Sequence, residues 1–148
     1  IRDSVTTQDW HIDPGDHFSS NPDFVDSWPP HGVAGTDEAE IHPAIAEIPV
    51  DAHVKKGQYA AAYSGFEGTI KGGSSLETIL RDHRIEAVDV VGLALSHCVK
   101  DTALDAQHLG FTTTCLTDLS EPVSLESGEA AVAAMEDAGV TVTTSSQL

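Results

Sequence analysis

The stretch "AVDVVGLALSHCVKDTALDAQHLG", residues 87–110, decides the fold class. Its first nine residues, Ala87 to Leu95, are nearly all apolar, as expected for a parallel strand that is buried on both faces. From about Val99 the pattern becomes helical, and Gly110 ends the predicted helix. A buried strand that passes directly into a helix is typical of α/β proteins, in which helices connect parallel strands.

The same alternation continues on both sides of this stretch. Further strands are expected at residues 4–7, 51–57, 111–119 and 140–144, and further helices at residues 74–85 and 124–139. The pattern predicts an α/β fold with a mainly parallel, doubly wound sheet and helices on both faces, as a single domain over residues 1–148. In such sheets ligands bind beyond the carboxyl ends of the strands.

Composition excludes some classes of partner. The net charge of −17 leaves only 7 Lys+Arg against 24 Asp+Glu. No basic patch can be assembled from so few cations, so we expect neither nucleic acid nor an anionic membrane as a partner. No apolar run has membrane length. The two cysteines, Cys98 and Cys115, make no disulfide framework, which predicts a reduced, cytoplasmic setting.

Cys98 is the first candidate for chemistry. It lies where the apolar strand turns into the following helix. The free N–H groups and the dipole at a helix N-terminus lower the pKa of a thiol and can bind a developing oxyanion. Cys98 is therefore a candidate nucleophile for attack on a carbonyl, with a buried packing role as the alternative. Cys115 lies in the middle of an expected strand, where a packing role is favoured.

A loop rich in histidine and aspartate, residues 6–31, offers a metal site. Asp9 and His11 are two residues apart, so they point the same way on an extended segment. His17 and His31 follow on a loop that can fold back. One carboxylate and three imidazoles suit Zn²⁺, Fe²⁺ or Mn²⁺, with water in the remaining positions. The alternative is a set of solvated histidines beside turn-forming residues such as "DPGD".

Three further residues have two interpretations each. Lys56 is either a cation that lowers the pKa of a nearby thiol or a solvated surface charge. Trp28 and Tyr63 lie in irregular segments rich in glycine and proline. Their rings can stack on a flat substrate or anchor the loops in the core.

Four motifs, spread over most of the chain, suggest a family. They are "QDWHIDPGDHFS", "WPPH", "KKGQYAAAYSGFEG" and "HCVKDTALDA". As a set they resemble the nicotinamidases, also called pyrazinamidases, of the isochorismatase-like cysteine hydrolase family. The resemblance implies the fold of that family and hydrolysis of nicotinamide to nicotinic acid and ammonia through a cysteine thioester, with pyrazinamide as a second substrate.

The resemblance also implies a role for each matching residue. One divalent metal ion (Zn, Fe or Mn) would hold the pyridine nitrogen and supply water. The nucleophile would be Cys98, with Lys56 as its activating partner. The implied metal ligands are Asp9, His11, His17 and His31; the implied oxyanion hole is the backbone N–H of Ala94 and Cys98, after a cis peptide; and the implied ring pocket is Trp28 and Tyr63.

The chain departs from the family pattern in three places. The family opens with a strand that ends in the aspartate of an Asp-Lys-Cys triad, and we expect that aspartate upstream of Ile1. Ser96 stands where aspartate is usual, which we expect to weaken order around the nucleophile. Gly32 stands where cysteine is usual, a change that looks harmless.

The expected lack of a first strand has a structural consequence. It would leave two buried strands without a neighbour, so we expect a further segment or a strand from another chain to fill the gap. Whether the chain forms a homo-oligomer is left open. Two other functions also stay open: a non-catalytic remnant that binds a metal or ligand, and a cysteine amidohydrolase that acts on another amide.

Overall fold

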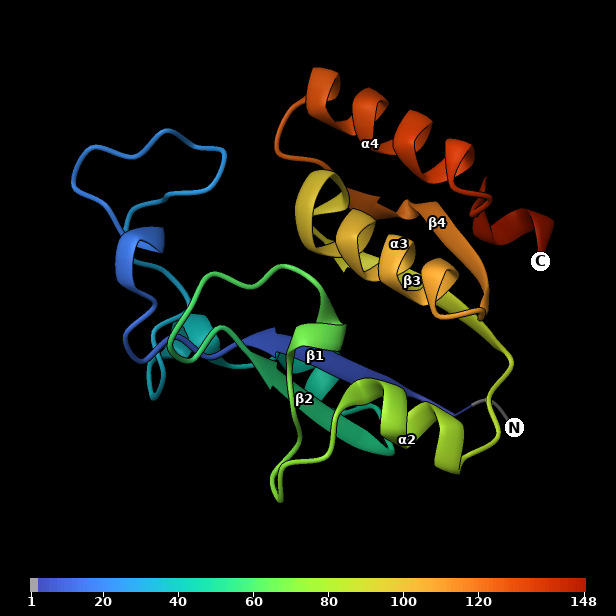
Figure 1. Ribbon diagram of the computed structural model, residues 1–148, viewed down its shortest axis with the longest axis horizontal. Helices are drawn as coiled ribbons and strands as arrows, with labels where there is room; N and C mark the ends of the chain where they lie inside the picture. Colours follow the sequence, from blue (N-terminus) through green and yellow to red (C-terminus); the bar gives the residue numbers. More distant parts are fainter. Residues whose placement is uncertain (1–2) are drawn as a thin grey trace. The chain divides into compact units, whose positions relative to one another are not determined.

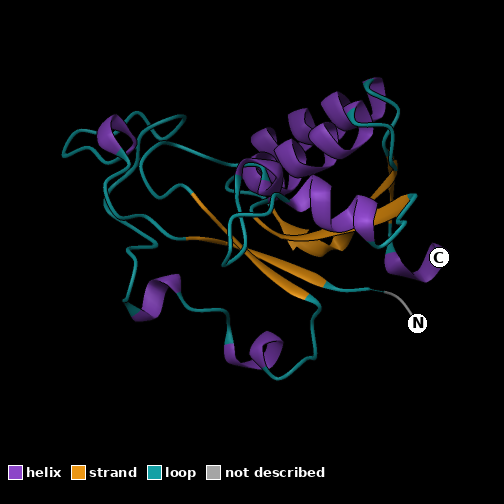
Figure 2. Ribbon diagram, turned by 60° about the horizontal axis from the view of Figure 1, so that its bottom comes forward, coloured by secondary structure: helices purple, strands orange, loops and turns teal. Residues whose placement is uncertain are grey.

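The computed structural model describes residues 3–148, which divide into two compact units after Leu76 (Figure 1). The N-terminal unit is dominated by loops, and the C-terminal unit by longer helices (Figure 2). α2 (Leu76–Asp82) begins at the division between the units. Within the described part of the chain, no helix has both the length and the apolar character needed to cross a membrane.

The N-terminal unit is built on two parallel strands, β1 (Val5–Asp9) and β2 (Ala52–Lys56). Their register sets Asp9 opposite Lys56, so both residues lie at the carboxyl end of the sheet. Long loops follow each strand from this end. They contain four short helices: η1 (Gly15–His17), η2 (Asp37–Ala39), α1 (Pro43–Ala46) and η3 (Gly65–Glu67).

The C-terminal unit contains a three-stranded parallel sheet. The strand order is β3 (Ala87–Leu93), β4 (Thr112–Glu121) and β5 (Thr141–Thr143). Helices make both connections between the strands, as parallel pairing requires. These helices are η4 (Leu95–Val99), which continues into α3 (Lys100–His108), and α4 (Leu125–Asp137), while η5 (Ser145–Gln147) ends the chain.

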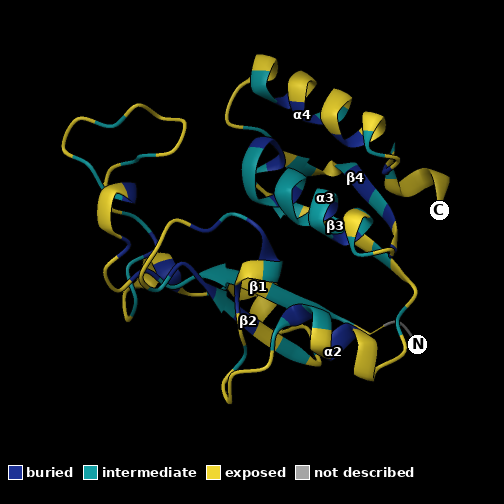
Figure 3. Cartoon of the chain, in the orientation of Figure 1, coloured by how far each residue is buried: buried dark blue, intermediate teal, exposed yellow. Residues whose placement is uncertain are grey.

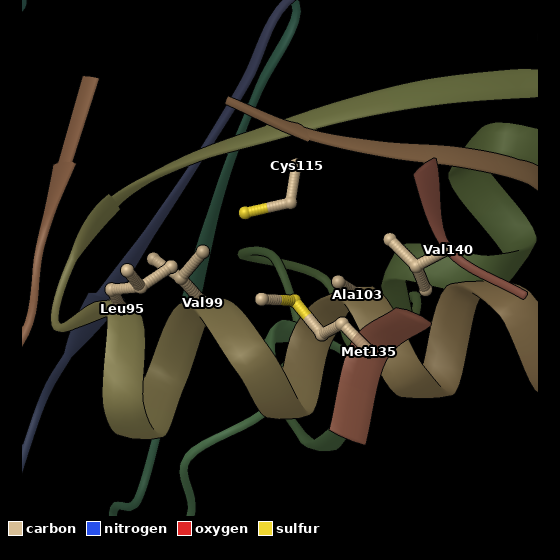
Figure 4. Packing of buried hydrophobic residues seen from close by; sticks show 6 residues of the cluster. All are labelled: Leu95, Val99, Ala103, Cys115, Met135 and Val140. Carbon is tan, nitrogen blue, oxygen red and sulfur yellow. The ribbon is translucent and has the colours of Figure 1, made fainter. Parts of the chain in front are cut away.

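The core of the C-terminal unit lies between the sheet and its helices (Figure 4). Cys115 of β4 is fully buried in it, so its predicted packing role is confirmed. Because burial disfavours the thiolate, it raises the pKa of the Cys115 thiol to about 11. The members of this core are Leu95, Val99, Ala103, Cys115, Met135 and Val140.

The structure confirms an α/β fold with parallel strands and alters two details. The strands form two separate sheets, one in each unit, in place of one continuous sheet. In addition, β3 is not buried on both faces: Val91 and Leu93 are 47% and 75% exposed. β3 contains exposed and half-buried residues, whereas β4 also contains buried ones (Figure 3). Both α3 and α4 pack on the opposite face, the one toward which Val90 and Cys115 point.

β3 also lies at the edge of its sheet. Among the described strands only β4 pairs with β3, which makes β3 an edge strand. An apolar run in the sequence indicates a strand, but it does not tell whether both faces are covered. From the sequence we expect an additional segment beside the buried strands, in place of the missing first strand. None of the five described strands is such a segment. A strand supplied by another chain stays a prediction.

Candidate active site

Three histidines converge in the loops beyond β1. One ring nitrogen from each of His11, His17 and His31 lies within 4.8 Å of the others. The ring centroids are 5.0–5.2 Å apart. His11 and His17 are buried and His31 is half-buried, so the alternative of solvated loop histidines is wrong. The structure thus brings together three of the four predicted metal ligands.

The Nδ1 atom of each histidine faces a backbone carbonyl. A carbonyl oxygen only accepts hydrogen bonds, so a histidine Nδ1 that faces one must carry the proton. In a neutral imidazole this leaves a free lone pair on Nε2. The Nδ1 contacts are His11 with the Gly57 carbonyl at 2.6 Å, His17 with the Asp26 carbonyl at 2.9 Å and His31 with the Pro29 carbonyl at 2.9 Å.

Burial affects both the hydrogen bonding and the pKa of His11. Its Nε2 atom is buried and has no hydrogen-bond partner among the described residues. Burial is the main cause that lowers the pKa of His11, and the Gly57 carbonyl and the Asp9 charge oppose it. Buried polar atoms are normally satisfied, and neutral imidazoles are metal ligands. A buried lone pair beside two more imidazoles therefore fits a divalent metal ion.

Two glycines make room for this cluster. Gly57 directly follows β2 with a φ of +73°, and a Cβ there would lie 2.5 Å from Cε1 of His11. Gly32 has a φ of +53°, its carbonyl accepts from the His11 amide, and a Cβ would lie 2.9 Å from Cβ of Asp9. The replacement of cysteine by Gly32 is therefore structurally important, because any side chain at this position would be strained and crowded in this backbone.

Sequence reasoning also missed Phe18. The centroid of its ring lies 5.3 Å from that of His11 and 5.4 Å from that of His31, so it forms an apolar wall of the cluster. Its position directly after His17 in the "DHFS" motif was the available signal.

Asp9 lies beside the histidine cluster and makes an ion pair with Lys56. It is not a member of the group formed by the three histidines. Lys56 is only 2% exposed, and its ammonium also donates to the carbonyl of Ala62 at 3.2 Å. The interpretation of Lys56 as a solvated surface charge is therefore wrong. The roles of Asp9 as a ligand and of Lys56 as an activator stay predictions.

The two predicted pocket aromatics lie against the same cluster. The indole of Trp28 donates to the Tyr63 hydroxyl at 3.1 Å, and that hydroxyl donates to the carbonyl of Val25 at 2.9 Å. The rings of Tyr63 and His17 meet edge to face, with centroids 5.7 Å apart. Both aromatics are half-buried, and their role in binding a substrate ring stays a prediction.

Cys98 lies in the C-terminal unit, at the predicted junction of strand and helix. The peptide bond between Leu93 and Ala94 is cis, as the resemblance implies. η4 begins directly after Ala94, and the carbonyl of Ala94 accepts from the amides of His97 and Val99, both at 3.1 Å. The helix therefore opens with a π-helical turn that contains Cys98, which is half-buried.

Ser96 is an ordered part of this junction. Its side chain is buried, its hydroxyl accepts from the amide of Val123 at 3.0 Å, and it lies 3.0 Å from Nδ1 of His97. Ser96 thus connects the start of the helix to the segment that follows β4. The prediction that Ser96 weakens order around the nucleophile did not take its hydrogen bond with Val123 into account.

Comparison with known proteins identifies the family. The isochorismatase domain family matches residues 6–147. A nicotinamidase/pyrazinamidase of Mycobacterium tuberculosis is 47% identical over 142 residues, which cover 96% of this chain and 76% of that protein.

Two solved structures share the fold. PnC1 of L. infantum, in complex with nicotinate, has a TM-score of 0.83 and 35% identity, covering 99% of this chain and 73% of that one. The pyrazinamidase of Pyrococcus horikoshii, in complex with zinc, has a TM-score of 0.76 and 34% identity, covering 95% and 74%. The chain therefore belongs to the isochorismatase domain family, together with the nicotinamidases and pyrazinamidases that it resembles.

Proposed function

We propose that this chain hydrolyses nicotinamide to nicotinic acid and ammonia, and that it also accepts pyrazinamide. The observation that carries the proposal is the buried histidine cluster with Trp28 and Tyr63 at its side. A pyridine ring needs flat aromatic neighbours, and its ring nitrogen needs an electrophilic partner. The 47% identical relative, which is named for both activities, supports the same substrate class.

The proposed cofactor is one divalent metal ion, either Zn, Fe or Mn. His11, His17 and His31 would hold it through Nε2, with Asp9 as the fourth protein ligand. Such an ion, when bound, supplies a Lewis acid and lowers the pKa of water. Support comes from the unsatisfied Nε2 of His11 and from the zinc complex of the Pyrococcus horikoshii relative.

The proposed nucleophile is Cys98. Its sulfur forms a bond to the carboxamide carbon, and the N–H groups of Ala94 and Cys98 stabilise the charge that develops on oxygen. The carbon–nitrogen bond then breaks, and ammonia leaves with the proton of the thiol. Water adds to the resulting thioester, which releases nicotinic acid and restores the thiol. Lys56 is proposed as the cation that favours the thiolate.

Product analysis with paired cysteine variants tests this proposal. We expect the protein that contains this chain, loaded with Zn²⁺, Fe²⁺ or Mn²⁺, to release equal amounts of ammonia and nicotinic acid from nicotinamide. Cys98→Ala should abolish release without changing the metal content, whereas Cys115→Ala should retain it. Release by the metal-loaded Cys98→Ala protein would contradict the proposal, and so would metal-loaded wild-type protein containing this chain that acts on neither amide.

A further inference from the structure

The carboxylate of Asp23 organises the exposed tip of the loop that follows His17. This loop extends away from β1 (Figure 1). One oxygen of Asp23 collects four hydrogen bonds, and these backbone contacts hold the pKa of Asp23 well below its usual range. The four donors to Asp23 Oδ1 are the amides of Val25 at 2.9 Å, Asp26 at 3.0 Å and Ser27 at 3.0 Å, and the hydroxyl of Ser27 at 3.0 Å.

Specific contacts are needed to hold the backbone conformation of this tip. Phe24 has a φ of +58°, in the left-handed region that residues other than glycine and asparagine rarely adopt. Phe24 is also exposed, so burial does not hold it in place. Further toward its base, the loop is closed by backbone bonds from Trp28 to His17 at 2.8 Å and from Ser19 to Trp28 at 2.9 Å. At the tip, the Asp23 carboxylate takes over this function.

Two neighbouring carbonyls of the fastened turn point back to the site. The carbonyl of Val25 accepts from the Tyr63 hydroxyl at 2.9 Å. The carbonyl of Asp26 faces Nδ1 of His17 at 2.9 Å, and so fixes which nitrogen of that histidine is free for a metal. One short turn therefore orients both an aromatic of the ring pocket and a candidate metal ligand.

We infer that Asp23 is a positioning residue that sets the metal affinity of His17 and the orientation of Tyr63. The inference rests on the proposed function both for its metal site and for its substrate. Asp23 acts only through the carbonyls of Val25 and Asp26. Removing its carboxylate frees the turn, so that the Asp26 carbonyl no longer holds the Nδ1 proton of His17. Loss of such outer contacts typically lowers metal affinity about 10–100-fold.

The experiment compares Zn²⁺ affinity of the full chain, measured by competition with a chromophoric chelator. We expect Asp23→Ala to weaken Zn²⁺ binding by about 10–100-fold. Asp23→Asn keeps an accepting oxygen but loses the charge, and charge-assisted hydrogen bonds are about twice as strong as neutral ones. Its affinity should therefore lie between those of Asp23→Ala and the wild type. With saturating metal, Asp23→Ala should raise KM for nicotinamide more than it lowers kcat.

Asp118→Ala is the matched control. Asp118 is another exposed carboxylate that fastens a backbone segment, accepting from the amide and the hydroxyl of Ser145 at 2.8 and 2.6 Å, but it lies in the C-terminal unit. Its loss should leave Zn²⁺ affinity unchanged. A general effect of losing a carboxylate would weaken Zn²⁺ binding equally in both variants and would overturn the inference.

Two outcomes separate this inference from the proposed function. A folded Asp23→Ala protein with wild-type Zn²⁺ affinity overturns the inference, whatever the chain hydrolyses. If Asp23→Ala does not fold, Asp23→Asn decides: an affinity equal to that of the wild type again overturns it. Weakened Zn²⁺ binding in a chain without amidase activity supports the inference and refutes only the proposed substrate.

Discussion

The ammonium of Lys56 and the carboxylate of Asp9 form an ion pair between two strands whose register sets them directly opposite each other. The lysine is almost fully buried, whereas the side chain of Asp9 is 29% exposed. A buried cation is costly when it loses its partner, while replacing both charges by apolar groups can be nearly neutral.

Asp9→Ala is therefore expected to lower the free energy of unfolding by about 3 kcal/mol, because the buried ammonium of Lys56 then loses its carboxylate partner. Lys56→Met added to Asp9→Ala should restore most of the loss. Urea unfolding with chelator present measures both variants without a contribution from metal. Equal stability of Asp9→Ala and the wild type would show that the pair is unimportant for folding.

His17→Ala should remove the metal. The wild-type chain is expected to carry about one divalent ion, and loss of one of three convergent imidazoles removes a large share of the binding energy. Elemental analysis after purification without chelator measures this. His53→Ala is the control, since His53 lies on β2 and contacts the Thr6 hydroxyl outside the cluster. Equal metal content in both variants would refute the site.

Gly57→Ala should disturb His11 specifically. The new Cβ would lie 2.5 Å from the imidazole, and the left-handed backbone adds a cost of about 1–2 kcal/mol. Gly72→Ala separates the two effects: Gly72 has a φ of +107° but no atom within 4 Å of a Cβ. Both variants should lose stability in urea, and only Gly57→Ala should lose Zn²⁺ affinity. Retained affinity in Gly57→Ala would mean that His11 is not a ligand.

The two cysteines should differ in reactivity. Burial raises the pKa of Cys115 to about 11, from an ordinary value of 9.0, so its thiol stays protonated in the folded chain. Iodoacetamide near neutral pH should label Cys98, and Cys115 only after unfolding. Peptide mapping with equal labelling in the folded state would contradict this.

The same shift makes stability depend on pH. The unfolded chain releases the Cys115 proton near pH 9.0 and the folded chain near pH 11. The contribution of Cys115 to stability is therefore complete below pH 9 and is lost as the pH rises from 9 to 11. Cys115→Ala should flatten the decline of the urea midpoint in this window, relative to its own value at pH 8. A decline as steep as that of the wild type would exclude Cys115 as its cause.

Ser96→Ala should loosen the junction that carries Cys98. It removes the acceptor of the Val123 amide, and a hydrogen bond of this kind contributes about 0.5–1.5 kcal/mol. Thermal unfolding measures the loss, with Ser20→Ala at an exposed loop position as the control. Equal midpoints for the two variants would show that this hydrogen bond contributes little.

The candidate site could be predicted only in part from the sequence. The sequence correctly indicated that His11, His17 and His31 come together, whereas Asp9, grouped with them by its spacing, pairs with Lys56. The carbonyls that fix the histidine tautomers could not be foreseen, because any residue can offer a backbone carbonyl. Lys56 did leave a signal: it lies two residues after the buried Val54, and so on the same face of β2.

For the fold, the strand and helix positions followed from apolar runs and glycine stops. The one-sided exposure of β3 did not, because a run such as "AVDVV" fits both a covered and an uncovered face. Face coverage depends on where the connecting helices pack, which sequence periodicity does not determine.

The exposed face of β3 has a consequence for the colloidal behaviour of the chain. Val91 and Leu93 lie bare on an edge strand, a pattern that favours association of one copy with another. At pH 7 the net charge of −17 opposes this, because two copies repel each other. That repulsion vanishes near the isoelectric point, about pH 4.4, and salt screens it at any pH. Dilute neutral buffer should therefore keep copies apart, whereas mild acid should bring them together along β3.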